Sequence, residues 1–174
     1  SLFPALLWGV AWANIIGGTP IDGDSEYIGN FFDLLSPYTL FAGLASLAIF
    51  FAHGALFLEL RTEGEVRQKA HAIAIKAMPL ALILAAGFLV WTLARADSLE
   101  VIPVIAAVIT LAAFLTATVL ARKSPGRAFA ATATGIAFYF ITQFATLFPH
   151  TMISSISSDF DMTLNGSSSS EYTL

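Results

Sequence analysis

SPYTLFAGLASLAIFFAHGALFLELRTEGEVRQKAHAIAIK, residues Ser36 to Lys76, is the stretch from which the rest of the chain can be interpreted. Its first 23 residues, as far as Leu58, contain no Asp, Glu, Lys or Arg. At about 1.5 Å of rise per residue, a helix of that length crosses the roughly 30 Å of hydrocarbon in a bilayer. The sequence therefore predicts a transmembrane helix that begins at Ser36.

The polarity changes directly after this apolar run. Opposite charges then recur one helical turn apart, in the pairs Arg61/Glu65, Glu63/Arg67 and Glu65/Lys69. Pairs at this spacing stabilise a helix that is exposed to water. We therefore expect the helix to leave the membrane and to continue as a charged cytoplasmic extension to about residue 75.

The composition of the whole chain is that of a membrane protein. Hydrophobic residues make up 57% and charged residues 11% of the 174 residues, whereas soluble domains carry roughly 25% charged residues. The net charge of -4 and the absence of a basic stripe argue against nucleic acid as a partner. The chain contains no cysteine, which excludes thiolate metal sites and covalent haem attachment. Membrane lipid is needed to cover the surplus apolar surface.

Five apolar segments predict the fold class, an all-α integral membrane protein built as an antiparallel transmembrane helix bundle. The last four segments each reach at least 18 residues without a formal charge, and four such runs in succession are not typical of buried helices in a soluble protein. The first run follows no Met or basic region, so we expect a fragment in which it is the remainder of a longer helix. The helices are expected in a single transmembrane domain over residues 1–174, at about 2–16, 36–60, 77–94, 101–121 and 128–148.

Basic residues predict the orientation of the bundle. Seven of the eight Lys and Arg residues fall in the stretches 61–76 and 122–127, which alternate along the chain with acidic or uncharged connections. The positive-inside rule places these two basic stretches in the cytoplasm. The loop 17–35 and the residues 149–174 are then extracytoplasmic. Within that last stretch, polar and apolar residues alternate from Asp159 to Asn165, which predicts an ordered loop with a short strand ending at an Asn165–Gly166 turn.

Three residues near the predicted cytoplasmic boundary are candidates for a proton route or an interface: His53, Glu59 and Arg61. His53 lies within the predicted membrane span, where an ionisable group often has a function. A simpler interpretation is a neutral imidazole that donates a hydrogen bond to a neighbouring helix. Glu59 could pair with Arg61 or feed protons inward, or it could be an ordinary interfacial carboxylate.

No motif for catalysis or metal binding accompanies these residues. His53, His71 and His150 are never within one helical turn of another histidine, so the spacing predicts no metal site and no pair of haem ligands on one helix. No nucleophile or phosphate-loop motif occurs either. We therefore expect no catalytic residue in this chain, and the sequence by itself assigns no cofactor-binding residue.

Several short stretches of the chain form a recognisable pattern. A Ser-Pro helix start, a helix rich in small residues and an Arg-Thr-x-Gly-Glu exit occur together, and further stretches of the pattern follow in a fixed order along the chain. These stretches are Pro4–Val10, Gly29–Leu40, His53–Gly54, Leu60–Glu65, Phe148–Ser155 and Ser168–Leu174. In this pattern the chain resembles subunit II of the cytochrome bd quinol oxidases.

The resemblance implies a multi-pass protein of the bacterial cytoplasmic (inner) membrane that belongs to a terminal oxidase of the respiratory chain. In the family, subunit I holds haem b, haem d and the substrate quinol, whereas subunit II binds no haem and stabilises the complex. Some members house a structural quinone or part of a proton route in subunit II. The resemblance also implies further helices before Pro4 and after Leu174.

Two other classes of membrane protein are alternatives to the oxidase hypothesis, a small-molecule transporter or permease and an assembly or scaffold protein without redox partners. Transporters usually contain broken helices and inverted repeats. Pro79 and Pro103 are expected near the starts of their helices, where a proline breaks nothing. The sequence therefore favours the oxidase subunit.

Overall fold

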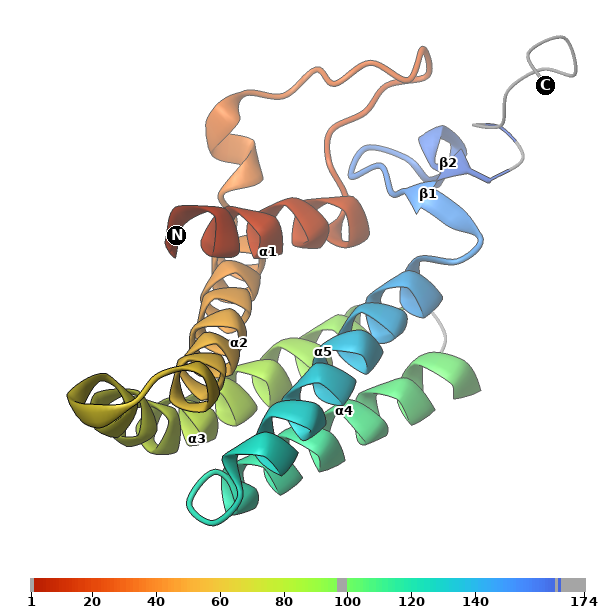
Figure 1. Ribbon diagram of the computed structural model, residues 1–174. Helices are drawn as coiled ribbons and strands as arrows, with labels where there is room; N and C mark the ends of the chain where they lie inside the picture. The colour runs from red at the N-terminus through yellow and green to blue at the C-terminus, as the bar shows by residue number, and fades with distance from the viewer. Residues whose placement is uncertain (1, 97–99, 165, 167–174) are drawn as a thin grey trace, which may run out of the picture.

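The computed structural model describes residues 2–96, 100–164 and 166. Five α-helices account for most of the chain (Figure 1). Two short 3₁₀ turns and a two-stranded antiparallel sheet complete the fold. The elements are α1 (Leu2–Gly17), η1 (Phe31–Leu34), α2 (Pro37–Arg61), α3 (Gly64–Arg95), α4 (Val101–Leu120), α5 (Pro125–Leu147), β1 (His150–Met152), η2 (Ser158–Phe160) and β2 (Met162–Thr163).

The predicted class, an all-α membrane protein, is confirmed. Helices α2, α3, α4 and α5 are each long and apolar enough to cross a membrane, whereas α1 has 16 residues. Consecutive helices pack against each other, and α2 also contacts α5. In Figure 1 the α2–α3 and α4–α5 turns lie at one end, and the loop after α1 lies with β1 and β2 at the other. The two basic stretches thus occupy the same end of the bundle.

The predicted charged extension of the second helix is wrong. Helix α2 ends at Arg61, and the charged residues instead form the first turns of α3. Thr62 has an extended backbone, and both its N–H and its hydroxyl donate to the carbonyl of Leu58, which ends the helix. Gly64 follows with a φ of +60°, a left-handed conformation that glycine adopts without steric cost. The chain therefore reverses direction at residues 62–64.

This reversal changes two further expectations. Lys69 and Glu65 form the predicted ion pair at 3.4 Å within α3. The pairs Arg61/Glu65 and Glu63/Arg67 were predicted on a helix that runs continuously through residue 62, and the chain leaves the helical conformation there. Pro79 also lies in the interior of α3, because that helix begins at Gly64 and not near residue 77. Helix α3 continues past this proline to Arg95.

Small residues allow the helices to approach closely. Helix α1 crosses α2 at Gly9, where an added Cβ would collide with the carbonyl of Ala42 and the Cβ of Ser46. Gly135 of α5 lies equally close to the ring of Phe114 in α4. The spacing of small residues on these helices predicts such contacts, because close packing rather than hydrophobicity drives association in lipid.

The segment after α5 is ordered as predicted up to residue 164, but its strand is shorter. Residues 158–160 form the turn η2, because the side chain of Ser157 accepts a hydrogen bond from the N–H of Asp159. Only Met162 and Thr163 remain to pair with β1. The predicted turn at Asn165–Gly166 lies partly outside the described residues. This segment is joined to the end of α1 by backbone hydrogen bonds between Thr19 and residues 153 and 155.

Candidate functional site

His53 faces helix α5 and is held there by two contacts. Its Nδ1 lies 2.6 Å from the hydroxyl oxygen of Thr132, and its ring stacks on Phe129 with the centroids 4.3 Å apart. The Thr132 hydroxyl donates to the carbonyl of Phe129, so its oxygen is the acceptor for an Nδ1–H of His53. This is the arrangement that the packing interpretation of His53 requires.

Glu59 faces helix α3 and is buried. Its carboxyl Oε1 lies 2.8 Å from Nδ1 of His71, and only 4% of its side chain is exposed. The other carboxyl oxygen, Oε2, is buried and has no hydrogen-bond partner among the described residues. Leaving a buried polar atom unpaired costs about 1–3 kcal/mol, more for a charged group. Glu59 is therefore an unusual group that packing alone does not explain.

Arg61 lies along its own helix and is exposed. The central carbon of its guanidinium is 5.9 Å from the centroid of the Phe57 ring, within the range of a cation–π contact. The three predicted candidates therefore do not form one cluster. At 3.6 residues per turn, positions 53 and 59 point to different sides of α2, so one residue contacts α5 and the other contacts α3.

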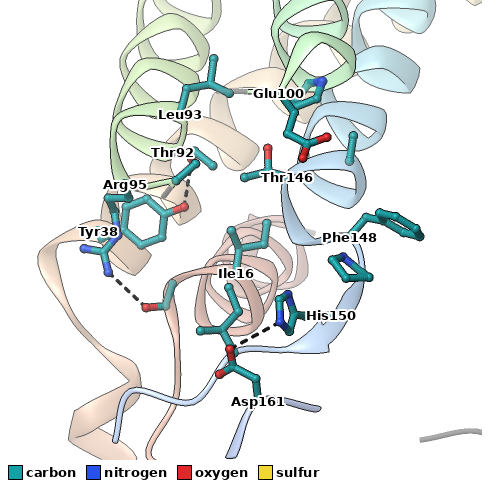
Figure 2. Close-up of a pocket in the computed structure, with 16 residues that line it drawn as sticks. Ile16, Tyr38, Thr92, Leu93, Arg95, Glu100, Thr146, Phe148, His150 and Asp161 are labelled. Carbon is teal, nitrogen blue, oxygen red and sulfur yellow. Dashed lines mark hydrogen bonds and ion pairs between the residues drawn. The ribbon is translucent and has the colours of Figure 1, made fainter. Parts of the chain in front are cut away.

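A cavity of about 390 Å³ lies at the opposite end of the bundle (Figure 2). It lies where the ends of α1, α3 and α5 meet the starts of α2 and α4. Polar and apolar groups line it in comparable measure. The lining includes Ile16, Tyr38, Thr92, Leu93, Arg95, Glu100, Pro103, Thr146, Phe148, His150 and Asp161.

Polar contacts on one wall of this cavity connect α1, α2 and α3. The hydroxyl of Thr92 donates to the carbonyl of Phe88, so its oxygen accepts from the phenol of Tyr38 at 2.9 Å. Arg95 lies 4.9 Å over the Tyr38 ring and donates from Nη2 to the carbonyl of Gly17 at 3.1 Å. These contacts hold the ends of the three helices together beside a partly polar space.

A second polar pair comes from the chain that follows α5. Nε2 of His150 lies 3.6 Å from Oδ2 of Asp161, and Figure 2 shows the pair on the side of the cavity away from Thr92. The other carboxyl oxygen of Asp161 accepts from the N–H of Ser154 at 2.7 Å. The cavity therefore offers a hydroxyl pair on one wall and an imidazole–carboxylate pair on another.

Sequence reasoning missed both His71 and the cavity. His71 and Glu59 are twelve residues apart, and they meet only because the chain reverses at residues 62–64. The Arg61–Glu65 stretch contains the signal for that turn, a glycine between two charged residues, but the charge spacing favoured a continuous helix. The cavity residues come from elements far apart in the sequence, and no local pattern marks them.

The described residues show no metal centre. Among residues 2–96, 100–164 and 166, no three His, Cys, Asp or Glu side chains lie close enough to hold a metal ion. Nδ1 of His53 contacts Thr132, Nδ1 of His71 contacts Glu59, and Nε2 of His150 lies 3.6 Å from Asp161. These contacts join each histidine to a different residue, and among the described residues they bring no two histidines together.

Known proteins resemble the chain along its whole length. The sequence profile described as cytochrome bd terminal oxidase subunit II matches residues 1–174. The cytochrome bd ubiquinol oxidase subunit 2 of Bacillus subtilis is 29% identical over the full chain, which spans 53% of that relative. The cytochrome bd-I ubiquinol oxidase subunit 2 of Escherichia coli K12 is 37% identical over 56% of the chain and 27% of the relative. The chain thus spans about half the length of the Bacillus relative.

Proposed function

Because the chain belongs to the cytochrome bd terminal oxidase subunit II family, we propose that it acts as part of the second subunit of a quinol:oxygen oxidoreductase. The observation that carries this proposal is the match of the family profile to every residue of the chain. The four helices that can span a membrane agree with it. The proposal places the protein in the bacterial cytoplasmic (inner) membrane, with the basic turns at residues 61–67 and 122–127 in the cytoplasm.

The proposed partner is a haem-bearing subunit I that carries haem b and haem d. Within the described residues no three His, Cys, Asp or Glu side chains come together as a metal site, and we assign the redox centres to the partner. The role that remains for this chain is to support subunit I within the membrane.

Co-purification tests this function. The full-length protein, tagged and extracted from its native membrane, is expected to elute with a second large hydrophobic subunit and with haem absorbance in the visible spectrum. A colourless single polypeptide would contradict the proposal and favour a permease.

We also propose that the cavity at the extracytoplasmic end holds the head group of a structural quinone. A volume of about 390 Å³ is within the usual range of small-molecule sites. Apolar side chains of the lining, among them Leu93 and Pro103, suit the apolar faces of the quinone ring. The guanidinium of Arg95, which has N–H groups besides the one donated to Gly17, and the imidazole of His150 suit the carbonyl oxygens as hydrogen-bond donors.

Filling the cavity tests the quinone proposal. Thr146 lines the cavity, and Thr146→Phe is expected to lower the amount of quinone that organic solvent extracts from the purified complex. Thr134→Phe on the exposed side of the same helix is the control and should leave the quinone content unchanged. Equal quinone content in both variants and in the parent would exclude this cavity.

The three candidate residues receive separate roles. We assign His53 to packing between α2 and α5, on the strength of its contacts with Thr132 and Phe129. Arg61 is proposed as an interface residue whose side chain reaches the lipid head groups from the end of α2. Glu59 remains the candidate for proton exchange.

A further inference from the structure

The starting observation is a buried carboxyl group that is bonded on one side only. Glu59 lies in the last turn of α2, yet 4% of its side chain is exposed, whereas 39% of the His71 side chain is exposed. Oε1 contacts Nδ1 of His71 at 2.8 Å, and Oε2 has no partner among the described residues. The pair therefore joins the imidazole of His71, which reaches water, to the carboxyl group of Glu59, which is buried.

The surrounding charges do not neutralise Glu59. On α2 the guanidinium of Arg61 lies over Phe57. On α3 the nearby Lys69 is paired with Glu65 at 3.4 Å. Helix α5 approaches α2 through Gly126 and Leu60, and its charged residue at that end is Arg127. Among the described residues, His71 is the only ion-pair partner recorded for Glu59.

A histidine is an unusual choice for a partner that is only structural. Arginine stays charged and binds both oxygens of a carboxylate at once, and it would leave no buried oxygen unpaired. Histidine makes one contact here, and an imidazole can both accept and donate a proton. The partner that the fold places beside Glu59 is thus a side chain that can exchange a proton, as a guanidinium cannot.

We propose that Glu59 and His71 form a proton-exchange pair at the cytoplasmic end of α2 and α3. The exposed imidazole of His71 takes a proton from water, and Nδ1 passes a proton to Oε1 of Glu59. In this second transfer the imidazolium–carboxylate pair becomes a neutral imidazole beside a carboxylic acid, with no change in the total charge of the pair. The proton then lies on Oε1, and rotation of the carboxyl group would bring it to the buried position of Oε2, which has no partner among the described residues.

This inference deepens the proposed function, because it assigns a proton site to the proton route considered for Glu59. It differs from the assignment of His53, whose ring is bonded to Thr132 on α5. Nothing recorded between the described residues joins His53 to Glu59, so the pair is a local site on the α2–α3 hairpin.

Infrared difference spectroscopy of the purified, full-length complex tests the pair, with the spectra recorded during a change of pH. The parent protein is expected to show a carboxylic-acid carbonyl band that shifts in D₂O. Glu59→Gln should abolish this band, and His71→Gln should shift both its frequency and the pH at which it appears. Glu65→Gln removes an exposed carboxyl group of α3 and should leave the band unchanged, which makes it the matched control.

The outcomes separate this inference from the proposed function. A band that survives Glu59→Gln, or that is identical in the parent and in His71→Gln, would overturn the pair even if the haems co-purify. Absence of haem would instead refute the proposed function, while the band still reports on Glu59. Glu59→Asp guards against misfolding, because it keeps a carboxyl group and should retain a displaced band.

Discussion

Nδ1 of His53 in helix α2 lies 2.6 Å from the hydroxyl oxygen of Thr132 in helix α5. This hydrogen bond connects two residues that are 79 positions apart along the chain. The Phe129 ring stacks on the same imidazole, so one histidine is fixed by both a polar and an apolar contact. An ionisable residue inside a membrane span can therefore have a structural role.

The first prediction concerns this hydrogen bond. His53→Gln should leave oxygen consumption near normal, because an amide can replace the imidazole as a donor. A double-mutant cycle that combines His53→Phe, which removes the donor, with Thr132→Val is expected to give a coupling energy of about 0.6–1.7 kcal/mol, measured by unfolding in detergent. Loss of oxygen consumption with haem content intact would contradict the packing role.

The second prediction concerns the crossing of α1 and α2. Gly9→Ala should lower the free energy of unfolding by roughly 1–3 kcal/mol, because the new methyl group meets the backbone of Ala42. Gly54→Ala is the control, since no atom of another element lies within 4 Å of the added Cβ. That change should be neutral or stabilise by up to about 1 kcal/mol. Thermal melting followed by circular dichroism measures both, and equal melting temperatures would refute the close approach.

The third prediction concerns the orientation in the membrane. The chain contains no cysteine, so a single introduced cysteine reports on one position. Gln68→Cys should resist a membrane-impermeant thiol reagent in intact cells and react after lysis, because the positive-inside rule places the basic segment around Gln68 in the cytoplasm. Asp24→Cys in the opposite loop should react in intact cells. The reverse pattern would invert the predicted topology.

The fourth prediction concerns Arg95, which contacts both Tyr38 and the carbonyl of Gly17. Arg95→Gln should destabilise the protein by about 0.5–1 kcal/mol, the usual value of an exposed cation–π contact. Because Arg95 holds the end of α1, limited proteolysis in the loop at residues 18–36 should become faster. Lys123→Gln at the other end of the bundle should leave the cleavage rate unchanged. Similar rates in the two variants would show that Arg95 does not hold this loop.

Much of the fold follows from local features of the sequence. The uncharged run after Ser36 predicts a span, and Ser36 with Pro37 predicts its first turn, where the serine side chain accepts the N–H of Thr39 as a cap. Length and hydropathy are properties of a continuous segment, so they can be summed without knowing which helices touch. The same reasoning failed at Thr62, because charge spacing indicates a helix but does not show where one helix ends and the next begins.

The sequence by itself determined that lipid is the solvent for this chain, because long runs without charge leave no other environment for their apolar surface. The sequence also determined the family, because several short stretches match the pattern of that family and occur in the same order along the chain. Only the tertiary structure decided that Glu59 meets His71 and that Tyr38, Thr92 and His150 surround one cavity. Such contacts depend on a chain reversal and on helix crossing, where small shifts in direction change which side chains meet. No pattern within a single segment records that geometry.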